Sequence, residues 1–137
     1  MKAYNAKDIR NIAIAGHSGR GKTTLAEAML FLAKATDRLG RVADGNTVLD
    51  FDAEEKRRKV TIATAMAAFD WNNTKINLLD TPGLFDFAGG VSEGMRAAES
   101  ALTVLAAGSG VDVGAEKAYK AASERKIAKL FAVTRCD

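Results

Sequence analysis

Nine consecutive residues near the amino terminus restrict the fold more than any other part of the chain. They read Gly16-His17-Ser18-Gly19-Arg20-Gly21-Lys22-Thr23-Thr24 and fit the pattern Gly-x-x-x-x-Gly-Lys-Ser/Thr, the P-loop that cradles phosphate groups. The residues before it, 12–15, are apolar and suit a short buried strand, and residues 25–33 are rich in helix-forming side chains. Because the motif requires strand, glycine loop and helix in this order, these flanks favour a phosphate site over a glycine-rich turn without a ligand.

The rest of the chain alternates between strand and helix patterns. After a strand at 11–15 and a helix at 22–34, we expect strands at 60–66 and 75–79 joined by a turn at 70–74, and further strands at 101–107 and 130–134. Helices are expected at 91–99, separated by Gly89-Gly90 from the loop before it, and at 115–126. Residues 35–59 combine turn formers with a dense charge run, which predicts a long loop. The sequence therefore predicts an α/β fold, a mostly parallel sheet with helices on both faces and ligands at the carboxyl ends of its strands.

The composition places few further limits on function. The chain has 137 residues, enough for one domain, with 47% hydrophobic and 27% charged residues and a net charge of only +3, which gives no reason to expect a DNA partner. Its single cysteine, Cys136, excludes an internal disulfide and is typical of a reducing compartment. Residues 1–8 lack the apolar stretch of a signal peptide, and no apolar run has the length of a membrane span, so we expect a cytoplasmic protein without a membrane partner.

Two motifs carry the chemistry of a nucleotide phosphate site. In the first, glycines let backbone N–H groups approach phosphate oxygens, Lys22 would bridge the β- and γ-phosphates, and the Thr23 hydroxyl would ligate Mg²⁺. The second is Asp80-Thr81-Pro82-Gly83, which follows a predicted strand. Asp80 would hold Mg²⁺ through water, and the Gly83 N–H would meet the γ-phosphate. For this shorter motif, a plain Asp-Pro-Gly turn is the alternative.

These motifs and several others, in the same order, resemble the amino-terminal part of the GTP-binding domain of elongation factor G, a translational GTPase. The resemblance covers nearly the whole chain and includes residues 40–45, Asp50-Phe51, Glu55, Arg58, residues 60–62 and 76–83, Asp86-Phe87, Gly110-Val111, Glu116, and Phe131 with Val133. It implies a P-loop NTPase fold, GTP and GDP with Mg²⁺ as ligands, GTP hydrolysis, and the ribosome as partner of the full-length protein. We expect residues 1–137 to be a monomeric, partial GTP-binding domain from a longer multidomain protein, truncated at its carboxyl end.

The resemblance also implies roles for individual residues. Residues 35–59 resemble switch I, and the segment from Asp80 into the helix at 91 resembles switch II. The resemblance implies Lys22, Thr61 and Gly83 as catalytic residues. It implies Thr23, Thr61 and Asp80 as metal ligands. Nucleotide contacts are implied for residues 16–24, for Asp80, Thr81, Pro82, Gly83 and Leu84, and for Thr134, Arg135 and Asp137.

Two departures from the family pattern leave alternatives open. The family reads guanine with Asn-Lys-x-Asp, but this chain has Thr134-Arg135-Cys136-Asp137 and keeps only the aspartate. The histidine that orients the attacking water in the family is Leu84 here, and leucine makes no hydrogen bond. We therefore expect hydrolysis to be slow or partner-dependent. The alternatives are a nucleotide-sensing module with little or no hydrolysis, and a changed base specificity, including an ATPase.

Overall fold

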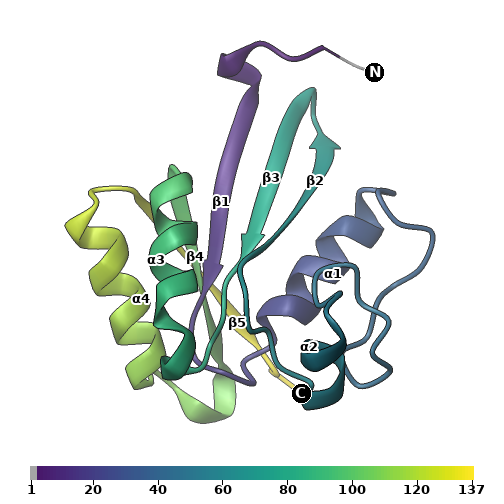
Figure 1. Cartoon of the computed structure of the whole chain (residues 1–137). Helices are drawn as coiled ribbons and strands as arrows, with labels where there is room; N and C mark the ends of the chain where they lie inside the picture. The colour runs from purple at the N-terminus through teal and green to yellow at the C-terminus, as the bar shows by residue number, and fades with distance from the viewer. Residues whose placement is uncertain (1–2) are drawn as a thin grey trace.

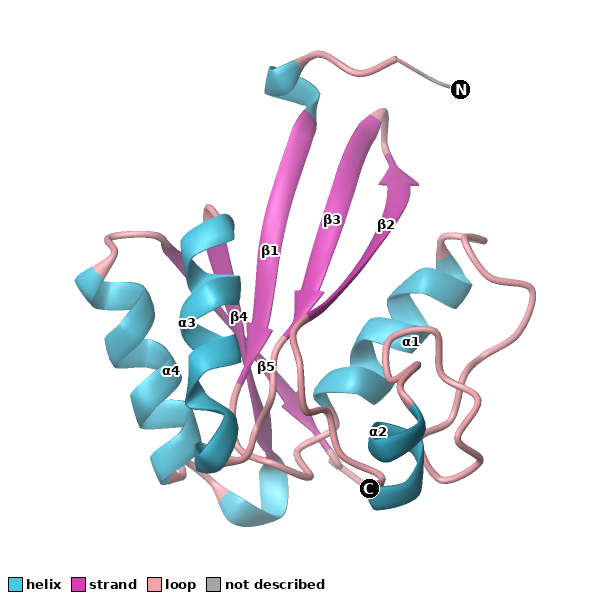
Figure 2. Ribbon diagram, viewed as in Figure 1, coloured by secondary structure: helices cyan, strands magenta, loops and turns pink. Residues whose placement is uncertain are grey.

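The computed structural model describes residues 3–137, which form one five-stranded sheet with helices on both faces (Figure 1). The strands, in the sheet order β2-β3-β1-β4-β5, are β1 (Ile9–Ala15), β2 (Ala65–Trp71), β3 (Thr74–Asp80), β4 (Ser100–Ala106) and β5 (Ala128–Thr134). The helices are α1 (Lys22–Leu32), α2 (Ala53–Arg58), α3 (Ala88–Ala97) and α4 (Val113–Glu124), with short 3-10 turns at Ala6–Asp8, Phe85–Phe87 and Ala107–Ser109 (Figure 2). The predicted α/β class and the predicted order of elements are confirmed.

The sheet is parallel except at one edge. β1 lies parallel to β3 and β4, and β4 lies parallel to β5, whereas β2 and β3 form an antiparallel hairpin. The turn predicted at 70–74 is confirmed and is narrower than expected, because only Asn72 and Asn73 stand outside the strands. Both asparagines have positive φ angles, 47° and 62°, and asparagine tolerates this conformation better than most residues, which suits it to a two-residue hairpin loop.

Two apolar layers cover the two faces of the sheet. Alternation along β1 directs Ala13 and Ala15 to one face and Ile14 to the other. The first face is rich in alanine and packs against α3 and α4, which lie together on the left in Figure 1. The second face carries larger side chains and packs against α1, with Leu30 and Leu49 both 1% exposed. Leu49 belongs to the segment predicted as a loop, so part of that segment is fixed in the core.

Three predictions differ from the structure by more than two residues, each for a local physical reason. The strand expected at 60–66 begins only at Ala65, because the carboxylate of Glu55 accepts the backbone N–H groups of Ile62 and Ala63. The loop expected over 35–59 contains α2, which Asp52 and Glu55 begin with a capping box. Gly89 and Gly90 lie inside α3 and not before it. A Cβ at Gly90 would be 2.9 Å from Pro82 Cδ, so glycine lets the helix approach that loop closely.

No helix among residues 3–137 combines the length and the apolar character that a membrane crossing requires.

Candidate functional site

The predicted motifs meet at the carboxyl edge of the parallel strands, at the bottom of Figure 1. β1 ends at Ala15 and leads into the P-loop, and β3 ends at Asp80, the first residue of the second motif. Because β1 and β3 are parallel neighbours, with Ile14 opposite Asp80 in the register, the two motifs lie side by side. Gly16 has a φ of 136°, and a Cβ there would be 2.5 Å from the Val104 carbonyl oxygen, so the start of the P-loop needs glycine.

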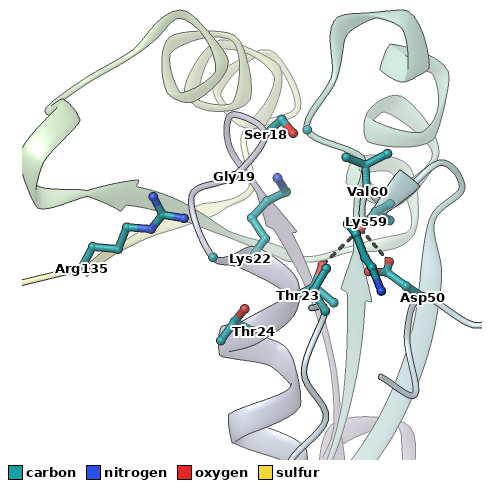
Figure 3. A pocket seen from close by; sticks show the side chains of 13 residues that line it. Ser18, Gly19, Lys22, Thr23, Thr24, Asp50, Lys59, Val60 and Arg135 are labelled. Carbon is teal, nitrogen blue, oxygen red and sulfur yellow. Dashed lines mark hydrogen bonds between the residues drawn. The ribbon is translucent and has the colours of Figure 1, made fainter. Parts of the chain in front are cut away.

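A pocket of about 240 Å³ opens at this edge (Figure 3). The P-loop and the start of α1 contribute Ser18, Gly19, Gly21, Lys22, Thr23 and Thr24 to its lining. Thr61, Gly83 and Arg135 were also predicted as site residues and line the same pocket from three other segments. The pocket has a volume suited to the phosphate groups of a nucleotide, with polar atoms on several sides.

Of the three residues predicted to ligate a metal, Thr23 contacts both of the others. Thr23 Oγ1 donates a hydrogen bond to Asp80 Oδ2 at 2.6 Å, and the oxygens of Thr23 and Thr61 are 3.1 Å apart. Thr61 Oγ1 in turn donates to Asp50 Oδ1 at 2.8 Å (Figure 3). All four side chains are buried. The structure thus brings α1, the switch I segment and the end of β3 together at one point.

Asp50 was not predicted as a site residue. It follows the buried Leu49 and is itself only 3% exposed, and its carboxylate lies next to the two threonines. The sequence contained a signal for it, because Asp50 is one of the positions shared with the resembling family. Within an irregular segment, however, neither hydrophobic period nor spacing distinguishes this aspartate from its charged neighbours.

The oxygens of this cluster fit a hard divalent cation. Among the described residues, Asp50 Oδ2 and Asp80 Oδ1 are buried without a hydrogen-bond partner, which is unusual for buried carboxylates. Carboxylate and hydroxyl oxygens are the ligands that Mg²⁺ prefers. Residues 3–137 hold no group of three or more His, Cys, Asp or Glu side chains arranged for a metal ion. An ion here would therefore share its ligands between the threonine hydroxyls, a carboxylate or its bound water, and phosphate oxygens of a nucleotide.

The pKa shifts of the buried carboxylates also favour a divalent cation at this site. Burial raises the pKa of Asp80 to about 7, although the Thr23 hydrogen bond and Lys22 oppose the rise. Burial also raises the pKa of Asp50, again against a hydrogen bond, here from Thr61. Lys22 is 6% exposed, and burial lowers its pKa. A cation placed beside these carboxylates would stabilise their charged forms.

Lys22 and Gly83 occupy the centre of the pocket. Lys22 Nζ donates to the His17 carbonyl oxygen at 3.0 Å. A Cβ at Gly83 would overlap Lys22 Nζ and would be 2.6 Å from the Ser18 nitrogen. Gly83 therefore lies directly against the P-loop, and any larger residue would displace the lysine amine.

The predicted base-reading residues are arranged differently. The Thr134 hydroxyl lies 2.7 Å from the Arg20 carbonyl oxygen and 3.1 Å from that of Leu105, so it ties the end of β5 to the P-loop. Arg135 lines the pocket with a φ of 52°. Asp137 is exposed and lies outside the pocket lining. Arg20 is not part of the pocket lining, and its Nε lies 2.8 Å from Asp112 Oδ2.

The remaining predicted residues lie beside the pocket. Leu84 lines a second cavity of about 260 Å³ between α3 and α4, together with Gly16 and Pro82. Thr81 is fully buried and donates to the Ile14 carbonyl oxygen at 2.8 Å, a structural bond between β3 and β1. The His17 ring packs edge-on against Phe85, with ring centres 5.5 Å apart.

Comparisons with known families and curated sequences agree with this geometry. The family described as the elongation factor Tu GTP binding domain matches residues 7–137. An elongation factor G-like protein of Mycobacterium tuberculosis is 41% identical over 129 residues, which cover 94% of this chain and 18% of that protein. The mitochondrial ribosome-releasing factor 2 of Yarrowia lipolytica is 42% identical over 138 residues, or 98% of this chain and 17% of that protein. The chain thus spans about a fifth of the length of the curated relatives it matches.

Solved structures show the same fold. A crystal structure of a protein from Thermus thermophilus superposes with a TM-score of 0.92 at 39% identity, over 94% of this chain and 20% of that one. A translation elongation factor SelB from Methanococcus maripaludis, solved with the GTP analogue GppNHp, gives a TM-score of 0.68 at 22% identity over 90% of this chain and 21% of its own. At that identity the second likeness concerns the fold alone.

Proposed function

The chain belongs to the family of elongation factor Tu-type GTP-binding domains, and from this membership we propose that it binds GTP with Mg²⁺ and hydrolyses it to GDP as the nucleotide switch of an elongation factor G-like translational GTPase. We further propose that residues 1–137 are part of a GTP-binding domain in a longer protein that works on the ribosome. The length of the curated relatives supports this, since the matched segment is 18% of one and 17% of the other.

The proposal assigns the phosphate end of the pocket to a few side chains. Lys22 contacts the β- and γ-phosphates, and P-loop N–H groups bind their oxygens. The hydroxyls of Thr23 and Thr61 ligate Mg²⁺, while Asp80 and Asp50 hold its water ligands. When bound, the ion neutralises charge that develops on the phosphate oxygens. The observation that carries this assignment is the buried contact between Thr23, Thr61 and Asp80, which joins three separate segments at one point.

The same contact suggests how hydrolysis is transmitted. Thr61 lies two residues after the end of the switch I segment and Gly83 lies in the switch II segment, and both line the pocket next to Lys22. Loss of the γ-phosphate removes the ligand that holds both segments to the P-loop, so each can move. We propose that this movement is the output that the ribosome-bound protein uses.

Leu84 favours a second candidate function, a nucleotide sensor that hydrolyses slowly or not at all. Its side chain lines the cavity between α3 and α4 and not the phosphate pocket, and a leucine in either place cannot orient water. In this candidate, binding of GTP or GDP alone sets the conformation of the switch segments.

Two measurements on the full-length protein that contains this chain test the proposal. Calorimetric titration with GTP, GDP and ATP, in Mg²⁺ and in EDTA, measures specificity and metal dependence. Single-turnover hydrolysis with and without ribosomes then separates the two candidates. Guanine preference with ribosome-stimulated turnover supports the GTPase, guanine preference without any turnover supports the sensor, and equal affinities for ATP and GTP contradict guanine specificity.

A further inference from the structure

A buried carboxylate outside the predicted site connects α1 to the switch I segment. Glu27 is 0% exposed and stands four residues after Thr23, so both side chains lie on the same face of the helix. It forms no ion pair with any other described residue. A buried carboxylate without a cation is costly unless hydrogen bonds satisfy it, so the position of Glu27 requires an explanation.

The partners of Glu27 are backbone groups of the switch I segment. Its Oε1 accepts the N–H groups of Val48 at 2.7 Å and Leu49 at 3.0 Å. Its Oε2 has no hydrogen-bond partner among the described residues and faces Gly40, where a Cβ would overlap that oxygen. Two separate parts of the segment, at residue 40 and at residues 48–49, therefore converge on one carboxylate of α1. Gly40 leaves the space that the carboxylate occupies.

The hydrogen bonds from Glu27 to Val48 and Leu49 end one residue before Asp50, which belongs to the candidate Mg²⁺ site. Asp50 follows Leu49 directly, is 3% exposed, and accepts the Thr61 hydrogen bond through Oδ1. The next residue, Phe51, is 69% exposed, and Asp52 after it caps α2. The Glu27 carboxylate thus holds the backbone of the two residues before Asp50. It thereby fixes where the Asp50 side chain lies relative to Thr61.

A second carboxylate acts from the other side. Glu55 is 3% exposed and its Oε1 accepts the N–H groups of Ile62 at 2.9 Å and Ala63 at 3.2 Å. Thr61 is therefore flanked by two anchors: its partner Asp50 is fixed through Glu27, and the residues after it are fixed by Glu55. Glu27 differs from Glu55 in belonging to α1, the helix that also carries Lys22 and Thr23.

We propose that Glu27 is a positioning residue that fixes residues 48–50 to α1 and so holds Asp50 in place for the Mg²⁺ that accompanies the nucleotide. The inference rests on the proposed function, because it assigns Glu27 a role in that metal site. It ties residues 40 and 48–50 of switch I to α1, the helix that also carries Lys22 and Thr23.

The test compares Glu27→Ala with Glu27→Gln in the full-length protein, with Glu124→Ala, an exposed residue at the end of α4, as the control. The measured quantity is the Mg²⁺ concentration needed for half-maximal GTP binding. Glutamine keeps an Oε1 that accepts both N–H groups, so we expect a value within about threefold of the parent, whereas alanine raises it on the order of tenfold. GTP binding in EDTA stays unchanged in all three. Equal weakening by alanine and glutamine would show that only the charge matters and would overturn the proposal.

A second readout does not depend on nucleotide. Amide hydrogen exchange of Val48 and Leu49 in the nucleotide-free protein should become faster by at least about tenfold in Glu27→Ala and remain slow in Glu27→Gln. Gly40→Ala displaces the carboxylate without changing α1, but its Cβ would also lie 2.9 Å from Thr47 Cα, so faster exchange there supports the anchor only together with Glu27→Ala. If Glu27→Ala fails to fold, unchanged exchange in Gly40→Ala alone contradicts the anchor. Unchanged exchange in both Glu27→Ala and Gly40→Ala contradicts the anchor itself. Faster exchange in a protein that binds no GTP would instead refute the proposed function while leaving the anchor intact.

Discussion

The two ends of the candidate nucleotide pocket are built in opposite ways. At the phosphate end, Lys22, Thr23, Thr61 and Asp80 are buried, and Thr23 contacts both Thr61 and Asp80. At the base end, Thr134 uses its hydroxyl on backbone carbonyls, and Asp137 is exposed. A substitution in a buried network of this kind is costly, because each side chain is a hydrogen-bond partner of another. The exposed end has fewer such contacts, and one of the two departures from the family pattern, at residues 134–136, lies there.

The largest expected effect comes from breaking the phosphate end. Lys22→Met removes the charge proposed to contact the β- and γ-phosphates and should weaken GTP binding on the order of 1,000-fold, about 4 kcal/mol. Lys120→Met, at an exposed position of α4, is the matched control and should bind as the parent does. Calorimetry with GTP and Mg²⁺ measures both. A loss smaller than about tenfold would mean that Lys22 does not meet the triphosphate.

The second prediction separates hydrolysis from binding at the same end. Leu84→His introduces a side chain that can orient water, and we expect single-turnover hydrolysis on ribosomes to rise roughly 100-fold, the range of acid–base and water-positioning groups. GTP affinity should change less than about threefold, because Leu84 does not line the phosphate pocket. Leu84→Phe, which fills space without a hydrogen bond, is the control. An unchanged rate in Leu84→His would show that the missing histidine is not what limits GTP hydrolysis.

The third prediction uses pH to examine the buried carboxylates. Burial raises the pKa of Asp80 to about 7, so below that pH the carboxyl group is protonated and must lose its proton before it can serve Mg²⁺. Metal-dependent GTP affinity should therefore increase with pH up to about 7 and level off above it, with a change of about tenfold per pH unit on the acid side. Asp80→Asn should bind Mg²⁺ weakly at every pH and show no such slope. A parent protein with a flat profile between about pH 5.5 and 8 would contradict this assignment.

The smallest effect is expected at the base end. Thr134→Val keeps the shape of the side chain but loses the hydrogen bond to the P-loop backbone, which should cost about 1 kcal/mol of folding stability. GTP affinity should fall by no more than a few-fold, in contrast to the changes at the phosphate end. Thermal unfolding and calorimetry of the same variant measure the two quantities. If Thr134→Val weakened GTP as strongly as Lys22→Met, the contrast between the two ends would not hold.

The sequence was sufficient to locate site residues where a motif is contiguous and lies next to a strand. The P-loop and the motif at Asp80 were located because each strand end fixes where the following residues lie. Gly90 shows the limit of local propensity. Its low helix propensity predicted a boundary, but its close approach to Pro82 places it inside α3.

Contacts between segments distant in sequence were not predictable. Glu27 has an ordinary helical context, and nothing local shows that it will accept N–H groups 21 and 22 residues away. Asp50 stands in an irregular segment whose conformation depends on that contact. Asp52 and Glu55 have the spacing of a capping box, but the adjacent run of charges led to the prediction of a loop, and α2 was not predicted. The structure was needed to show that these acidic residues fix the segment in place.

The most direct test of the central claim is the crystal structure of the full-length protein with a non-hydrolysable GTP analogue and Mn²⁺ in place of Mg²⁺, because anomalous scattering locates the ion independently of its ligands. The account predicts one Mn²⁺ bound by the hydroxyls of Thr23 and Thr61 and by the phosphates, with Asp50 and Asp80 beside its water ligands and Lys22 on the γ-phosphate. An ion bound elsewhere, or a triphosphate that does not reach Lys22, would contradict it.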